Sequence, residues 1–181
     1  METDTRSSPL FLITLIVDII ALLMGIFCRV MAREPSGKVI NDTLLGDLRT
    51  YKILINLSDA GILLFMFLLG ALVVLGFRGK FPFYLILAGL GIWFFGICFV
   101  KAVPPILNKP EVVSAVCTDR EIHVNGRHSH KVRYQLSFDN GSEVSKRGAE
   151  YSDAVGKSFY VVMCGDTAIE AYDPAEYSLT L

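Results

Sequence analysis

Two long apolar runs, residues 53–77 and 83–100, are separated by a joint of only a few residues. The first run carries the polar residues Asn56, Ser58 and Asp59, and the second has no charged residue. An α-helix rises about 1.5 Å per residue, so about 20 apolar residues cross the roughly 30 Å hydrocarbon core of a bilayer. Because the joint permits only a tight reversal, the pattern predicts a transmembrane helical hairpin.

A third apolar run, Leu10 to Phe27, precedes the hairpin and is interrupted only by Asp18. A cleaved signal peptide is the competing interpretation, but the basic start is thin and no cleavage site of small residues follows, so we expect the helix to be retained. The predicted spans are about residues 10–28, 53–77 and 82–103, within a membrane region of 10–105 that follows a polar tail of 1–9. Pro104 and Pro105 are expected to end the third helix.

The loop of residues 29–52 contains a possible helix start. Asn41 is placed to cap a helix ahead of Leu44, Leu45 and Leu48, which recur at helical spacing. Two interpretations remain open at this point. The segment is either a short helix lying on the membrane surface or the first turns of the next transmembrane helix.

Beyond residue 110 the hydrophobic period changes from helical to two. Apolar side chains alternate with polar ones from Lys131 to Phe138, and Asn-Gly pairs at 125–126 and 140–141 indicate hairpin turns. The sequence therefore predicts a soluble all-β domain over 111–181, an antiparallel five-strand meander or small open barrel. The expected strands are 112–124, 132–138, 143–147, 158–163 and 167–172.

Composition supports a chain in two parts and excludes one class of partner. The hydrophobic fraction is 52% and the mean hydropathy is +0.49, with the apolar residues concentrated before residue 105. A net charge of −1 and a pI near 6.3 leave no basic face for neutralising phosphates, so no nucleic-acid partner is expected. The lipid bilayer is the predicted partner, and no cofactor is predicted.

The distribution of basic residues predicts the orientation of the helices, because cytoplasmic flanks are enriched in Lys and Arg. One side collects seven of them and the other side three. The larger group is Arg29, Arg33, Lys38, Arg49, Lys52, Lys101 and Lys109, and the smaller is Arg6, Arg78 and Lys80. This places the N-terminus outside and the β domain in the cytoplasm.

Charged residues within a bilayer are costly and therefore informative. By residue count Asp59 lies roughly 9 Å deep and Lys101 roughly 4 Å, a gap that a lysine side chain can bridge, which predicts an ion pair holding the second and third helices in register. Asp18 lies deeper, without an evident partner. It is either a protonatable site for ion or proton movement, or a neutral group hydrogen-bonded to a residue such as Thr14 or Asn56.

Cysteines and histidines in the β domain offer two further hypotheses. Cys117 and Cys164 could form a disulfide if the domain faced an oxidising compartment, whereas a cytoplasmic domain would keep both reduced. His123, His128 and His130 invite a metal site, since His-x-His puts two side chains on one face of a strand. Their position around an Asn-Gly turn favours ordinary surface histidines, so no metal site is predicted.

No motif in the sequence indicates catalysis. Gly156-Lys157-Ser158 resembles the end of a phosphate-binding loop, but no glycine stands at the required distance before it, and a strand follows where the motif needs a helix. No serine lies on a recognisable nucleophile turn. The chain is therefore predicted not to be an enzyme.

The final segment, from Val155-Gly-Lys-Ser-Phe-Tyr-Val-Val-Met163 to Ala168-Ile-Glu-Ala-Tyr-Asp-Pro174 and Tyr177-Ser-Leu179, carries a resemblance. It is similar to the end of a β domain in small bacterial membrane proteins of unknown function, in which a VG...YVV strand precedes a YDP strand end. The likeness covers roughly the last 30 residues and implies a bacterial inner-membrane protein. It carries over no catalytic residue.

Three functions fit these features. The first is a non-enzymatic membrane protein whose cytoplasmic β domain binds another protein or a second copy, in an accessory, scaffold or envelope role. The second is an immunity or resistance protein against a membrane-active toxin. The third is a small oligomeric ion or proton conductor that uses Asp18.

Overall fold

The computed structural model describes residues 9–78, 81–124 and 132–180. The chain divides into two compact units. The helical unit comprises Met1–Arg33 and Thr50–Val103, and the barrel unit comprises Glu34–Arg49 and Pro104–Leu181.

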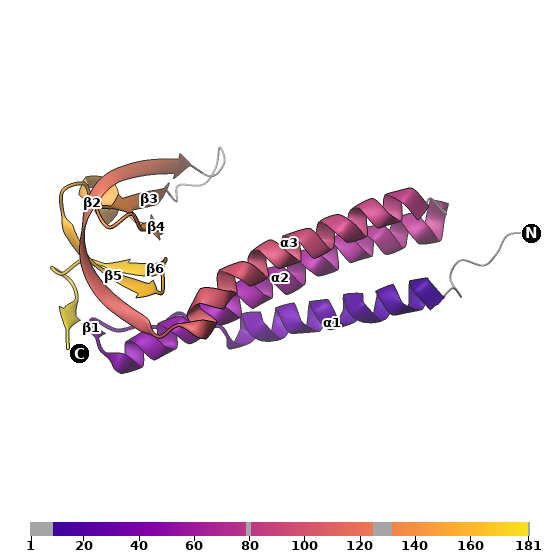
Figure 1. Ribbon diagram of the computed structural model, residues 1–181, viewed down its shortest axis with the longest axis horizontal. Helices are drawn as coiled ribbons and strands as arrows, with labels where there is room; N and C mark the ends of the chain where they lie inside the picture. The colour runs from indigo at the N-terminus through magenta and orange to yellow at the C-terminus, as the bar shows by residue number, and fades with distance from the viewer. Residues whose placement is uncertain (1–8, 79–80, 125–131, 181) are drawn as a thin grey trace, which may run out of the picture. The chain divides into compact units, whose positions relative to one another are not determined.

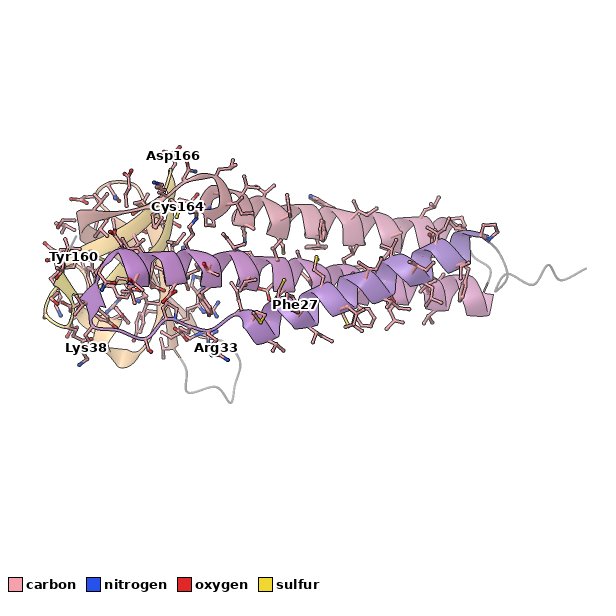
Figure 2. The ribbon with its side chains drawn as sticks, turned by 90° about the horizontal axis from the view of Figure 1, so that it is seen from below. Phe27, Arg33, Lys38, Tyr160, Cys164 and Asp166 are labelled. Atoms are coloured by element: carbon pink, nitrogen blue, oxygen red, sulfur yellow. The ribbon has the colours of Figure 1, made fainter. Side chains whose placement is uncertain are left out.

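Three long helices account for the first part of the chain: α1 (Pro9–Met31), α2 (Asp42–Arg78) and α3 (Phe81–Leu107). Each contains a segment long and apolar enough to cross a membrane, with mean hydropathies of 2.8, 2.3 and 2.3. Many of their large apolar side chains are exposed, and Figure 2 shows carbon-rich side chains along all three. A helical part of membrane-spanning character followed by a small β domain confirms the predicted fold class.

The start of α2 decides between the two interpretations of the first loop. The side chain of Asn41 accepts a hydrogen bond from the backbone N–H of Leu44 at 2.9 Å, as an N-cap does. From Asp42 the helix continues without a break to Arg78. The segment is therefore the first turns of the second long helix, and a separate surface helix is wrong.

The end of α3 corrects a prediction, because Pro104 and Pro105 lie inside the helix, which ends at Leu107. A proline lacks the N–H that would bond the carbonyl four residues earlier. For Pro105 that carbonyl belongs to Lys101, and the side-chain amide of Asn56 donates to it at 3.1 Å. The side chain from α2 thus satisfies the carbonyl that the proline leaves open.

Arg49 caps the C-terminus of α3 within the barrel unit. Its guanidinium donates to the carbonyl of Pro105 through Nε and to that of Ile106 through Nη2, the latter at 2.7 Å. Both carbonyls belong to the last turn, which has no intrahelical donors, and a positive charge there also complements the helix dipole.

We expect Arg49→Ala to destabilise the barrel unit by about 1–2 kcal/mol, because two carbonyls lose a charged donor. Thermal unfolding and amide exchange over residues 104–109 would measure the effect. Arg49→Lys is the matched variant, since it keeps the positive charge but cannot contact both carbonyls. Its stability should lie between that of the unchanged protein and that of Arg49→Ala. Unchanged exchange in Arg49→Ala would contradict the capping role.

Five strands form the barrel: β2 (Pro110–Val124), β3 (Val132–Phe138), β4 (Glu143–Arg147), β5 (Ser158–Cys164) and β6 (Thr167–Tyr172). Their order is β4-β3-β2-β5-β6, and every neighbouring pair is antiparallel. Strand β2 is shared, since its first half pairs with β5 and its second half with β3, with a register shift between Cys117 and Asp119. Figure 1 shows β2 as one long, curved ribbon. The five predicted strands are confirmed.

The barrel core follows from the alternation that predicted the strands. Inward side chains from all five strands form one buried cluster that includes Ala115, Leu136, Val144, Phe159 and Ala171. The rings of Phe138 and Phe159 meet edge to face, with centroids 5.8 Å apart. Each fully buried side chain of this size contributes about 1.5–3 kcal/mol. A short 3₁₀ helix, η2 (Ala149–Asp153), connects β4 to β5.

A second, two-stranded sheet was not predicted. Strand β1 (Val39–Ile40) pairs in parallel with β7 (Ser178–Leu179), through backbone bonds from Ser178 to Lys38 and from Thr180 to Ile40. Ile40 is completely buried. Part of the loop predicted as interfacial, residues 34–49, thus belongs to the barrel unit. Strands of two residues are too short to show a hydrophobic period.

Candidate functional site

One buried stripe on α1 brings small and polar residues into the helical unit. Its members follow one another at spacings of three or four, which places them on a single face. They are Thr14, Asp18, Ala21, Gly25 and Cys28. This α1 stripe contacts α2 closely, because a Cβ added at Gly61 would lie 2.7 Å from the carbonyl oxygen of Ala21. Ser58 also donates to the carbonyl of Gly25 at 2.9 Å.

Asp18 is the buried acid of the α1 stripe, with 2% of the residue exposed. Among the residues that the structure describes, its Oδ1 atom has no hydrogen-bond partner. The hydroxyl of Thr14 donates to the carbonyl of Leu10 at 2.8 Å and lies 2.7 Å from the hydroxyl of Tyr84, from which it accepts. Asn56 is engaged at Lys101. The two partners predicted for Asp18 are therefore bonded elsewhere.

The predicted ion pair between Asp59 and Lys101 is wrong. Asp59 lies 3.7 Å from Arg29, at the end of α1, and both side chains are more than half exposed. Lys101 lines an outward groove on α3 instead. The residue count gave depths that a lysine side chain can bridge, but it could not give the helix face on which each charge lies.

In the barrel unit, a second polar cluster lies where the barrel is not closed by hydrogen bonds. Strands β4 and β6 end the sheet order and lie near each other without forming a ladder. Lys146 Nζ lies 2.6 Å from Glu170 Oε1, with side-chain exposures of 14% and 17%. The rings of Tyr151 and Tyr172 lie 5.4 and 5.3 Å from the same nitrogen. We call these four residues the β4–β6 seam.

The charge states of the β4–β6 seam favour a binding or structural role. Burial lowers the pKa of Lys146, but the Glu170 carboxylate and the Tyr151 hydroxyl more than offset it, so the pKa lies above its usual value. Burial, followed by the nearby Glu170, raises the pKa of Tyr172. At neutral pH the lysine is charged and the tyrosine protonated, so neither is an activated base.

Cys117 and Cys164 lie far apart in the barrel, and both are free and buried. Cys164 is opposite Pro110 on β2, and Cys117 lies seven positions further along that strand. At about 3.3 Å per residue this is about 23 Å, beyond the roughly 7 Å that a disulfide spans between Cα atoms. The disulfide considered for an oxidising compartment is therefore incompatible with this fold.

We expect both thiols to resist maleimide in the folded protein and to react after denaturation. Burial raises the pKa of Cys117 and of Cys164, and it also blocks access. Mass spectrometry of labelled protein, with and without denaturant, would count the modified sites. The single variants Cys117→Ala and Cys164→Ala assign each label, and rapid labelling of the native barrel would contradict the burial.

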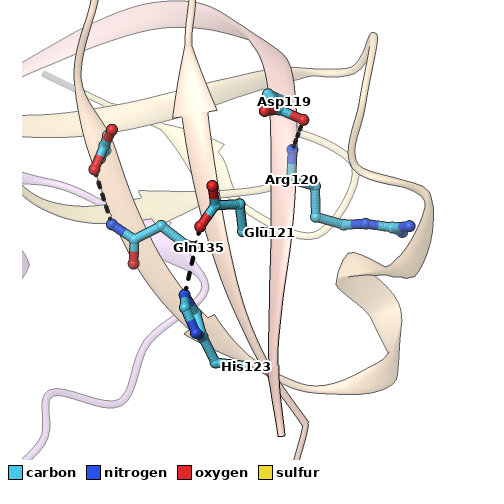
Figure 3. Close-up of polar contacts among 6 residues, drawn as sticks. Asp119, Arg120, Glu121, His123 and Gln135 are labelled. Atoms are coloured by element: carbon cyan, nitrogen blue, oxygen red, sulfur yellow. Dashed lines mark hydrogen bonds and ion pairs between the residues drawn. The ribbon is translucent and has the colours of Figure 1, made fainter.

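The histidine hypothesis concerns the outer surface of β2, β3 and β4. His123 Nε2 lies 3.7 Å from Glu121 Oε2, and Gln135 donates to Glu143 at 3.0 Å (Figure 3). His128 and His130 lie outside the described residues. Within the described part of the chain, no three His, Cys, Asp or Glu side chains are grouped to hold a metal ion. The described contacts form an exposed polar surface.

The fold points to a class of protein, because three helices of spanning length and apolarity, followed in the chain by a small β domain, are typical of an integral membrane protein. Comparison with protein-family models, curated proteins and solved structures gives no match.

Sequence reasoning missed both the β4–β6 seam and the close contact of α1 with α2. In the sequence of β4, Lys146 looks like an ordinary surface lysine, so nothing there indicates its contact with Glu170. The helix contact left a signal that could have been read, since Ala21 and Gly25 are small residues four apart.

Proposed function

We propose that this chain is a non-enzymatic integral membrane protein whose barrel unit binds a protein partner in the cytoplasm. The observation that carries the proposal is the β4–β6 seam, where two strand edges approach each other without a ladder. The raised pKa values of Lys146 and Tyr172 support a binding role over a catalytic one. A bacterial inner membrane is the setting implied by the resemblance of the final segment.

Unpaired strand edges explain how a partner would bind. Within the described residues, β4 and β6 each have a neighbouring strand on one side only, so the other edge of the sheet at each of them offers backbone groups to an added strand. A side-chain ion pair, between Lys146 and Glu170, spans the gap in place of backbone hydrogen bonds. The outward residues Glu143, Ser145 and Arg147 of β4 are exposed and include one acidic and one basic side chain. They suit an extended partner segment that carries charges of both signs.

A photo-cross-linking residue at Ser145 of the full-length protein, in its own cells, tests the proposal. We expect an adduct with one protein, mapped to an extended segment of that protein. Tyr160 on β5 is the control position, because the backbone there is paired on both sides, with Ser114 of β2 and Tyr172 of β6. Absence of an adduct at Ser145, or the same adducts at both positions, would reject the β4–β6 seam as the binding site.

The proposed orientation places the N-terminus outside and the barrel unit inside, from the excess of basic residues on the barrel side. After fusion to Leu181, a reporter that works only in the cytoplasm should be active, and a reporter that works only after export should be inactive. Activity of a reporter that requires export would reverse the orientation.

A second candidate function rests on Asp18, which is buried without a hydrogen-bond partner at Oδ1 among the described residues. Such a carboxyl group within a span can bind and release a proton. The candidate is an oligomeric proton or ion conductor. Flux in vesicles containing the purified protein should fall in Asp18→Asn, and flux that is unchanged, or not detectable in the unmodified protein, rejects this function.

A further inference from the structure

An apolar groove of about 580 Å³ follows one face of α3. Its lining residues recur at helical spacing and are Ile92, Trp93, Gly96, Ile97, Val100 and Lys101. Gly96 forms its floor, since a Cβ added there would have nothing within 4 Å. The side chains around that floor project outward, and Trp93 and Val100 are 64% and 65% exposed. The groove therefore faces the surroundings of the helical unit.

The groove has one charged end. Ile92 and Lys101 are nine residues apart, or about 14 Å along the helix axis, and Lys101 is the sole charged residue of the lining. Among the described residues Lys101 forms no ion pair, while its carbonyl accepts the Asn56 amide that fixes the backbone at this point. An apolar channel that ends at a cation complements an amphipathic molecule with an anionic head.

We propose that this groove binds an anionic phospholipid, with an acyl chain lying along residues 92–100 and the phosphate at Lys101 Nζ. The inference rests on the proposed membrane placement. The charge and length of the groove match a lipid better than a second copy of α3. Two helices approach closely through small residues four apart, and the neighbours of Gly96 at that spacing are Ile92 and Val100. A copy would also bring no counter-charge to Lys101 if it docked through the same face.

Trp93 provides the measurement, because it is the single tryptophan of the chain and lines the groove. The full-length protein is placed in phosphatidylcholine vesicles that contain a small, equal fraction of either brominated phosphatidylglycerol or brominated phosphatidylcholine. Bromine quenches tryptophan at short range. We expect about fivefold higher occupancy beside Trp93 for the anionic lipid, the preference that one lysine at a membrane surface provides.

Three variants separate the contributions. Lys101→Gln should abolish the preference for the anionic lipid, and Gly96→Leu should reduce quenching by both lipids because it fills the floor of the groove. Lys109→Gln removes a lysine eight residues further along the chain, which does not line the groove, and should leave the preference unchanged.

The outcomes distinguish this inference from the proposed function. Equal quenching by the two lipids, or a preference that survives Lys101→Gln, overturns the lipid site while leaving the membrane placement intact. Weak quenching by both lipids in protein that floats with the vesicles also overturns it, and shows that a second copy or another chain covers the groove. Failure of the protein to float with vesicles overturns the membrane placement and the lipid site together.

Discussion

Gly61→Ala is expected to weaken the packing of α1 against α2 by about 1–3 kcal/mol, although it adds a single methyl group. The new Cβ would lie 2.7 Å from the carbonyl oxygen of Ala21 and 2.9 Å from the backbone nitrogen of Gly25. Both atoms are backbone, so no flexible side chain can move aside. The two helices must separate, and contacts along the α1 stripe are lost with them, including the hydrogen bond from Ser58 to Gly25.

Gly89→Ala is the matched control, since a Cβ at that position has nothing within 4 Å. Both changes replace glycine by alanine in a long apolar helix, so their helix propensities cancel in the comparison. Thermal unfolding of the purified protein in detergent, followed by helical circular dichroism, would measure the difference. Equal melting of the two variants would show that α1 does not pack on α2 through Gly61.

Lys146→Met is expected to destabilise the barrel unit by about 1.5–3 kcal/mol, because the largely buried Glu170 carboxylate, with 17% of its side chain exposed, loses its charged hydrogen-bond donor. Glu170 would keep the backbone N–H of Ala171, at 3.1 Å, but would lose the 2.6 Å contact to Lys146. The double variant Lys146→Met with Glu170→Leu should recover most of this loss, since two apolar side chains can replace a largely buried ion pair at little cost.

Lys157→Met provides the control for Lys146→Met, since Lys157 is exposed. Unfolding by urea, followed through the amide exchange of β4 and β6, would report on the barrel unit within the whole protein. A Lys146→Met variant as stable as Lys157→Met would show that the ion pair contributes nothing. A double variant no more stable than the single one would contradict the account based on an unpaired carboxylate.

The β4–β6 seam also predicts alkaline unfolding. The pKa of Lys146 is raised from 10.5 and that of Tyr172 from 10.0, so the folded barrel holds both protons more tightly than the unfolded chain. Their stabilisation is complete below these values and is lost as pH rises through the folded pKa values. The barrel should therefore lose stability above about pH 10, and Tyr172→Phe should make that loss less steep. A flat pH dependence from pH 8 to 12 would contradict the assignment.

The sequence predicted the elements well where a hydrophobic period ran long enough to be counted. The alternation from Lys131 to Phe138 gave β3, and apolar length gave the three helices. The alternation of apolar residues in a strand and the length of an apolar run in a helix are both local properties of the sequence, so they can be read without knowing the fold. The β1–β7 pair joins residues from distant parts of the chain, and two residues carry no period.

Contacts between charged groups were less predictable than the elements. Asp59 and Lys101 were matched by depth, yet the rotation of each helix, which depends on close packing at residues such as Gly61, determines the partner. Lys146 and Glu170 meet because the sheet curves until its two end strands approach. Neither the rotation of a helix about its axis nor the closure of a sheet can be predicted from the spacing of residues in the sequence.

The parallel pairing of β1 with β7 has a consequence for biosynthesis. A ribosome makes β1 before α2, α3 and the whole five-stranded barrel, and β7 only after them. The segment that contains Ile40 therefore stays unpaired while α2 and α3 are synthesised and inserted into the membrane, because its partner strand does not yet exist. A premature stop codon before Ser178 would yield a chain that still contains all three long helices but leaves this early segment unpaired.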